Sequence, residues 1–306
     1  MTSPRIIGST ACVLGFTVLL ACWVGGCRND HATPVPEQTI ITIRGSSGVY
    51  PLALKWAPGF SEAFPEYRID VRDTGSSEGI EDLLAGRADV AMASRPMSAE
   101  EASTARARGL DIRETEVARM GIAVIVNASN PVSEMSFRQL AKVFSGDAQN
   151  WREVGGSDQP IVVVRKVSGW SPDLFRHEIL GGREFVPGAI VVDDKEDVVA
   201  EVEIRPWSIG FTGLAQALPA IDRVHLLRLT NDLSDKDATF ALSRPLYFYT
   251  LADSPIAKPF LKYVLGDEAQ QLVLGTGVFP ASGHDIGADE QVAIAEAPPE
   301  NGESSP

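Results

Sequence analysis

Three serine–glycine loops contain the residues best suited to bind a small anion. They are residues 44–51 (RGSSGVYP), 73–79 (DTGSSEG) and 165–171 (RKVSGWS), and each follows a strand-like run or leads into a helix-like run. Glycine allows the backbone to approach a ligand closely, serine supplies a hydroxyl donor, and a helix N-terminus supplies unpaired N–H groups and partial positive charge. The loops are therefore candidates to surround one tetrahedral anion, whereas any one of them alone also fits a turn that caps a helix. The candidate ligands are Ser46, Ser47, Gly48, Val49, Ser76, Ser77, Ser168, Gly169 and Trp170.

Two charged residues could complete such a site. Arg165 ends an apolar run and opens the third loop, and a guanidinium can donate two parallel hydrogen bonds to an oxyanion. Asp89 stands directly before the apolar run 90–93. Its carboxylate would accept a proton from hydrogen phosphate and repel a fully ionised ligand such as sulfate. The alternatives are a surface salt bridge for Arg165 and an ion-paired or helix-capping role for Asp89.

The elements that position these loops alternate between short β-branched runs and helix-like runs. Strands are expected at 39–43, 67–71, 90–93, 122–126, 161–164, 189–192, 209–211 and 245–250, and helices at 52–64, 80–85, 98–108, 137–144 and 256–274. This alternation predicts an α/β protein with mostly parallel sheets. Residues 28–38 are polar and proline-containing and predict a linker, while the acidic residues 283–306 predict a disordered tail.

The N-terminal segment predicts export and lipidation. Arg5 is followed by no charged residue from 6 to 27, as in a secretory signal. The sequence VGGC, which ends at Cys27, resembles a bacterial lipobox, in which the cysteine becomes the lipidated first residue. Cys22 is a rival, but the polar residues after Cys27 make Cys27 the better choice. An uncleaved membrane anchor is the alternative. Each interpretation places the rest of the chain in the cell envelope, facing the periplasm or the extracellular side.

Composition and motif searches argue against several other functions. The chain has 27 basic and 41 acidic residues among 306 and a net charge of −14, which disfavours nucleic acid as a partner. Its four histidines show no HxH or HExxH spacing, and its three cysteines all lie within the first 27 residues, so no metal site is predicted. GxxxxGK[ST] is absent. We therefore expect a binding protein with no catalytic residues and no cofactor.

Seven motifs in order along the chain carry a family resemblance. They are GSSGVYPL, DTGSSEG, ADVAMASRPMS, GIAVIVNASNPV, FRQLAKVFSGDAQNWREVGG, VVVRKVSGW and FLKYVLGDEAQQLVLGTGVFPAS. Together they resemble the phosphate-binding proteins of bacterial ABC importers, in the type II periplasmic-binding-protein superfamily, over nearly all of residues 40–282. The resemblance implies a lipoprotein that binds inorganic phosphate and delivers it to an ABC permease.

The implied fold has two α/β lobes with the ligand cleft between them. Lobe one would comprise residues 39–121 and 245–282, lobe two residues 122–244, with signal peptide 1–27 before them. The chain would cross between the lobes twice, near 122–127 and near 244–250. Such a hinge would close on ligand that contacts both lobes.

Only some of the family's ligand residues have a match in this sequence. The family's first loop falls on residues 47–50, where Gly48 and Val49 lack a hydroxyl, and its second-loop serine falls on Ser76. Its aspartate matches Asp89. Its R-x-x-x-S-G-T motif is one residue shorter here, at 165–170, and Trp170 replaces the threonine. These departures leave two alternatives: an envelope protein with a degenerate cleft, sensory or structural, or a binder of a different oxyanion or organic anion.

Overall fold

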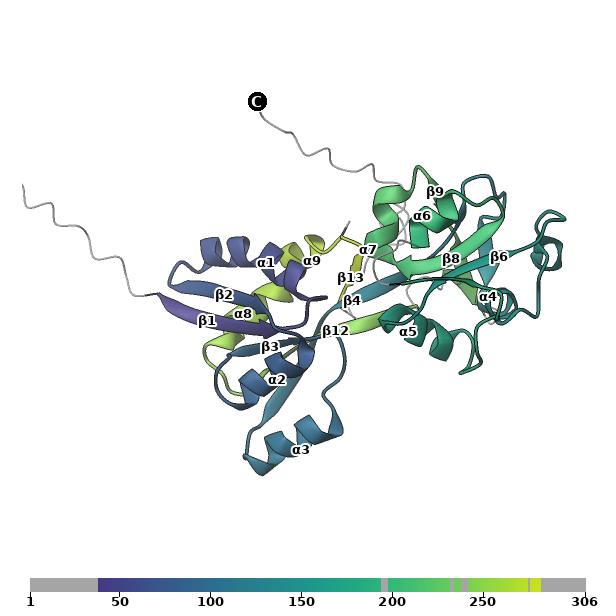
Figure 1. Ribbon diagram of the computed structural model, residues 1–306. Coiled ribbons are helices and arrows are strands. Elements are labelled where there is room, and N and C mark those ends of the chain that lie inside the picture. Colours follow the sequence, from purple (N-terminus) through teal and green to yellow (C-terminus); the bar gives the residue numbers. More distant parts are fainter. Residues whose placement is uncertain (1–37, 194–197, 232–233, 238–241, 275, 282–306) are drawn as a thin grey trace, which may run out of the picture. The chain divides into compact units, whose positions relative to one another are not determined.

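The computed structural model describes residues 38–193, 198–231, 234–237, 242–274 and 276–281, and Figure 1 shows the arrangement of their elements. The predicted α/β class is confirmed. The strands are β1 (Thr39–Gly45), β2 (Tyr67–Asp73), β3 (Val90–Ala93), β4 (Ile112–Asn127), β5 (Glu134–Ser136), β6 (Val162–Lys166), β7 (Ile190–Val192), β8 (Ser208–Gly213), β9 (Val224–Leu226), β10 (Arg228–Asn231), β11 (Ser234–Asp237), β12 (Ser243–Leu251) and β13 (Val278–Pro280). The α-helices are α1 (Tyr50–Ala63), α2 (Ser76–Leu84), α3 (Ala99–Ala107), α4 (Phe137–Ser145), α5 (Trp170–Glu178), α6 (Val198–Glu203), α7 (Leu214–Ala217), α8 (Ala257–Val264) and α9 (Asp267–Gln271), and the 3-10 helices are η1 (Trp151–Val154) and η2 (Leu218–Ala220).

One large sheet links most of the strands. Its order is β2-β1-β3-β12-β4-β8-β6-β7, with β9 and β13 also paired to β4, while β11, β10 and β5 form a second sheet. Pairs at both ends of the large sheet are parallel, but β4 and β12 are antiparallel to each other and to their other neighbours. The sheet is therefore mixed rather than mostly parallel. The prediction was wrong here because it did not include the antiparallel pairing of the two long strands β4 and β12.

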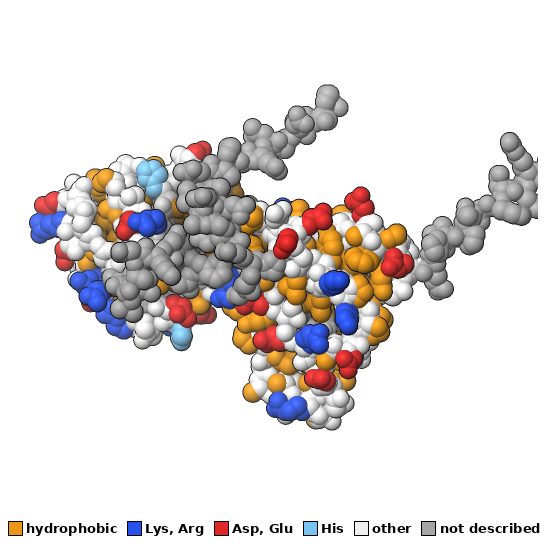
Figure 2. All heavy atoms as spheres, turned by 180° about the vertical axis from the view of Figure 1, so that it is seen from behind, with side chains coloured by type: hydrophobic (Ala, Val, Ile, Leu, Met, Phe, Trp, Pro, Cys, Tyr) orange, Lys and Arg blue, Asp and Glu red, His pale blue; other side chains and the backbone are white. Residues whose placement is uncertain are grey.

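The surface carries charges of both signs. Figure 2 shows acidic and basic side chains interspersed among hydrophobic ones on the face turned away from the view of Figure 1. The net negative charge therefore forms no single continuous acidic patch on the visible, described part of that face. No helix in the described part of the chain is both long and apolar enough to cross a bilayer. The segments predicted as signal peptide and acidic tail, with Cys27, lie outside the described residues.

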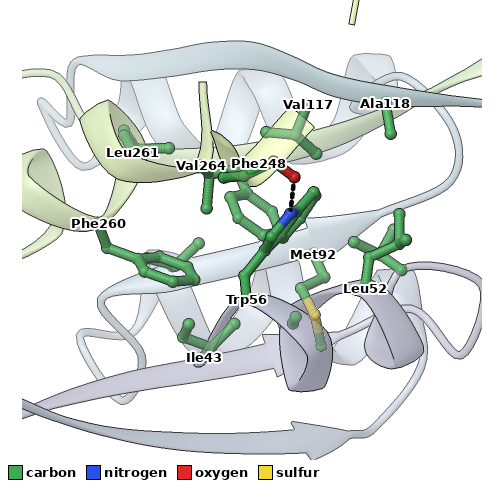
Figure 3. Packing of buried hydrophobic residues seen from close by; sticks show 14 of the residues in the cluster. Ile43, Leu52, Trp56, Met92, Val117, Ala118, Phe248, Phe260, Leu261 and Val264 are labelled. Carbon is green, nitrogen blue, oxygen red and sulfur yellow. Dashed lines mark hydrogen bonds between the residues drawn. The ribbon is translucent and has the colours of Figure 1, made fainter. Parts of the chain in front are cut away.

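The first core lies around β1, β3 and β12. Its hydrophobic clusters draw on residues 41–120 and 246–278, with α1, α8 and α9 on one face of the sheet and α2 and α3 on the other. Trp56 of α1 is fully buried, and its ring meets that of Phe248 edge-on at 6.0 Å. Figure 3 shows this packing, in which the indole N–H of Trp56 donates a 2.8 Å hydrogen bond to the carbonyl of Ala269. This bond fixes α9 against α1.

The second core lies around β4, β6 and β8. Its clusters draw on residues between 122 and 242, together with Phe279. The rings of Phe175 and Phe211 stack at 4.1 Å and hold α5 on β8. β4 contributes Ala118 to the first core and Ile122 to the second. β4 therefore belongs to both cores.

Two elements differ most from their predicted lengths. β4 begins at Ile112, ten residues before the predicted start, and pairs with all of β12. The helix expected over 256–274 is two helices, because the chain leaves the helical conformation at Gly266 (φ −78°, ψ 154°). Asp267 and Glu268 then occupy the first turn of α9, where negative charge is favourable.

Candidate functional site

The first loop is tightly held between β1 and α1. Gly45 has φ 137°, a left-handed value that favours glycine. Ser46 is buried, its N–H donates to the carbonyl of Met92 (2.9 Å), and its Oγ accepts the N–H of Gly48 (3.2 Å). Val49 is fully buried in the first core. Of the four residues predicted as ligands in this loop, Ser46 and Val49 thus have structural contacts, whereas Ser47 is exposed and Gly48 half-buried.

The second loop touches the first. The N–H groups of Thr74 and Gly75 both donate to the carbonyl of Gly45, at 2.9 and 3.0 Å. Ser76 begins α2, and its Oγ accepts the N–H of Ser94 at 3.3 Å. Ser77 Oγ accepts a hydrogen bond from the guanidinium of Arg95 at 2.8 Å. The structure therefore brings the N-termini of α1 and α2 together at the end of β1, as the sequence predicts for a shared anion site.

Asp89 lies away from these loops. Its carboxylate accepts the N–H of Thr42 at 2.8 Å, and its own N–H donates to the carbonyl of the same residue at 2.9 Å. Asp89 precedes β3 and Ser94 follows it, so four strand residues, about 13 Å at 3.3 Å each, separate the two positions. The prediction that Asp89 contacts the anion is corrected: its carboxylate closes the β1–β3 pairing at the opposite end of the strand.

The third loop presents the N-terminus of α5. Gly169 (φ 116°) precedes this helix, which has no side-chain cap, and Ser168 is exposed. Arg165 donates from Nη1 to the carbonyl of Lys166 at 2.9 Å, and its guanidinium lies 4.8 Å from the centre of the Phe185 ring. Its buried Nε has no hydrogen-bond partner among the residues that the structure describes, and burial lowers the pKa of this guanidinium. No hydrogen bond or ion pair among the described residues joins Arg165 to the first two loops.

Two residues that sequence reasoning missed connect the loops. The guanidinium of Arg244, in β12, lies 4.5 Å from the centre of the Trp170 ring at the start of α5. Arg244 is paired in register with Met120 of β4. The methyl group of Met120 would lie 2.9 Å from a Cβ built on Gly48. The one available signal was a cation, Arg244, at the start of an otherwise apolar strand-like run.

A cavity of about 300 Å³ lies over this junction. That volume is at the lower end of the range for ligand pockets, about 300–1,000 Å³. Its lining includes Ser47, Gly48, Met120 and Gly213. The described lining also includes Lys55 and no carboxylate. Trp170 is not part of the lining but is a neighbour of Gly213, because its ring would lie 3.4 Å from a Cβ built on Gly213.

The comparisons with known protein families and with known sequences agree with each other. The family model described as a PBP superfamily domain matches residues 31–268. The chain is 27% identical over 293 residues to "Phosphate-binding protein PstS" of Staphylococcus haemolyticus, covering 88% of this chain and 90% of that protein. It is 26% identical over 287 residues to the protein of the same name from Staphylococcus aureus USA300, covering 88% and 86%.

Solved structures agree with the fold. An ABC-type phosphate transport receptor from Vibrio cholerae matches with a TM-score of 0.57 and 27% identity, over 78% of this chain and 99% of that one. A putative phosphate ABC transporter substrate-binding protein with bound phosphate, from Clostridium perfringens, matches with a TM-score of 0.57 and 25% identity, over 79% and 100%. PstS from Borrelia burgdorferi shares the fold, with a TM-score of 0.61 at 22% identity over 79% and 99%. The predicted periplasmic-binding-protein architecture is therefore confirmed.

Proposed function

The chain belongs to the PBP superfamily, and from this premise we propose that it binds inorganic phosphate outside the cytoplasm and delivers it to an ABC permease. The names of the relatives support the ligand. One structural observation carries the proposal: the N-terminus of α1 lines a cavity, the loop before α2 is hydrogen-bonded to Gly45 beside it, and the first residue of α5 lies next to Gly213 of the lining. A helix N-terminus favours an anion.

We choose the proposed ligands from the loop residues whose hydroxyl or N–H groups can reach an anion. We keep Ser47, Ser76, Ser168 and Gly169 from the sequence prediction, because these residues lie at the loop surfaces or helix N-termini; Gly48 is left out because its N–H already donates to Ser46 Oγ. Ser46 and Val49 would act indirectly, by shaping the first loop. Binding by such groups is reversible and needs no covalent step, so we propose a carrier rather than an enzyme. Contacts from both cores would favour the arrangement that holds the anion between them.

Anchoring by a lipid at Cys27 is part of the proposal. The supporting observation is the lipobox-like VGGC sequence after an uncharged segment. In cells fed a labelled fatty acid, the unmodified protein should incorporate label and Cys27→Ser should not, while Cys22→Ser serves as the matched control. Label that persists in Cys27→Ser and disappears in Cys22→Ser would move the anchor to Cys22.

Isothermal titration with phosphate and with sulfate tests the ligand. Ser168→Ala should weaken phosphate binding about ten- to a hundredfold, since a hydrogen bond to a charged group contributes about 1.5–3 kcal/mol. Ser157→Ala, at a partly exposed serine outside the three loops, should bind like the unmodified protein. No heat with phosphate would refute the proposal. Sulfate is included because Asp89 lies too far away to repel it.

One observation favours a second candidate, a different oxyanion or a small organic anion. Trp170 stands where the family has threonine, and its ring lies next to Gly213, which lines the cavity. An aromatic ring offers a flat apolar surface to a larger ligand. Heat with an organic phosphate or carboxylate, and none with inorganic phosphate, would support this candidate.

A further inference from the structure

Among the described residues, Arg244 has no counter-ion. It is half-buried in β12, and its buried Nε has no hydrogen-bond partner in that part of the chain. Within the described part of the chain its guanidinium forms no ion pair, and its one contact of note is the Trp170 ring at 4.5 Å. Burial lowers the pKa of Arg244 to about 10. The group therefore stays protonated at neutral pH, and a charge held this way is stabilised by any anion placed beside it.

The sheet directs Arg244 toward the cavity side. Arg244 stands directly opposite Met120, and residues directly opposite in an antiparallel pair share one face of the sheet. Two residues further along, Leu246 stands opposite Ala118, and both pack in the same cluster of the first core. Met120 lines the cavity. Arg244 and the cavity thus lie on the same face of the crossover strands.

The ring of Trp170 holds the guanidinium of Arg244 in place. This ring lies under Arg244 and also adjoins Gly213, which lines the cavity. A guanidinium stacked on an indole keeps its N–H groups free at the edge for an oxyanion. Trp170 is also the first residue of α5, so the cation lies beside the helix N-terminus that the proposed function assigns to the ligand.

We infer that Arg244, from the crossover strand β12, is the cation that pairs with the bound anion, and that Trp170 holds it in place. The inference rests on the proposed function and deepens it. Arg165, which the sequence analysis assigns to this role, lies over Phe185 instead and donates to the carbonyl of Lys166. Both arginines are half-buried, and among the described residues neither Nε has a hydrogen-bond partner, but burial acts more strongly on Arg244, whose pKa it lowers to about 10.

Phosphate titration of the full-length protein at pH 7 compares four variants. Arg244→Gln should weaken binding about ten- to a hundredfold. Arg244→Lys should weaken it less, because lysine keeps the charge but loses the planar fork. Arg165→Gln should weaken it less than Arg244→Gln does. Arg119→Gln is the matched control, because it removes the same charge. Arg119 is the residue before Met120 in β4 and therefore lies on the opposite face of the sheet, where it pairs with Glu116.

The outcomes separate the inference from the proposed function. If the unmodified protein binds no phosphate, both are refuted. If it binds and Arg244→Gln binds equally well, or Arg119→Gln loses as much, the inference alone is overturned. A larger loss in Arg165→Gln than in Arg244→Gln also overturns it. If Arg244→Gln does not fold, Arg244→Lys decides: reduced affinity supports the inference, and unchanged affinity refutes it.

Discussion

Replacing Gly79 by alanine would place a methyl group where α2 touches the end of β1. The new Cβ would lie 2.5 Å from the Cα of Gly45 and 2.6 Å from the carbonyl oxygen of Arg44, against 3.4–4 Å for ordinary contact. Both obstacles are backbone, so no side chain can rotate away, and α2 must move by about 1 Å. Overpacking of this kind costs about 1–3 kcal/mol. Alanine regains about 1 kcal/mol of helix propensity, which leaves a net loss of about 0–2 kcal/mol, and we expect the upper end because both obstacles are backbone atoms.

Gly59 provides the matched control. It also lies inside a helix, α1, but a Cβ there meets only the ring and hydroxyl of Tyr263, at the far end of a flexible side chain. Gly59→Ala should therefore stay within about 1 kcal/mol of the unmodified protein. Urea unfolding followed by tryptophan fluorescence measures both variants. If Gly79→Ala is as stable as Gly59→Ala, the close backbone contact does not hold the first two loops together as argued.

Two further predictions concern stability. Trp56→Phe removes the hydrogen bond to Ala269 and part of a fully buried ring, so the free energy of unfolding should fall by about 2 kcal/mol; an unchanged urea midpoint would contradict this. The hydrogen bond from Arg95 lowers the pKa of Glu101, so its stabilisation is present above the unfolded pKa and lost as the pH falls through the folded pKa. Glu101→Gln should therefore lower the melting temperature at pH 7 and much less at pH 3, and equal losses at both would count against the ion pair.

Local signals predicted many elements well. Ser98 followed by acidic residues predicted the start of α3, and the structure shows a capping box between Ser98 and Glu101. The first half of β4, IRETEVARM, was missed because its many charged residues hide a strand whose pairing partner, β12, lies more than a hundred residues away. The break at Gly266 was missed because apolar residues recur on both sides of it.

The three loops of the candidate site could be predicted from the sequence, but the residues that meet in space around them could not. The three serine–glycine loops could be found because glycine, serine and helix starts are local features. Asp89 was misplaced because a sequence does not show that the two ends of β3 face different surroundings. Arg244 went unnoticed because a single arginine in a strand is usually a surface residue. Its importance depends on Met120 and Trp170, which neighbour it only after both cores have formed.

An acidic protein can still hold an anion, because distance decides which charges matter. Two unit charges 4 Å apart near a protein surface interact by about 4 kcal/mol, whereas at 20 Å in water the figure is about 0.2 kcal/mol before salt reduces it. Screening at physiological salt acts over about 8 Å. The net charge of −14 is therefore a weak repulsion at the site. At the proposed site, the guanidinium of Arg244, which forms no ion pair among the described residues, the N-termini of α1, α2 and α5, and a described cavity lining without a carboxylate would outweigh it.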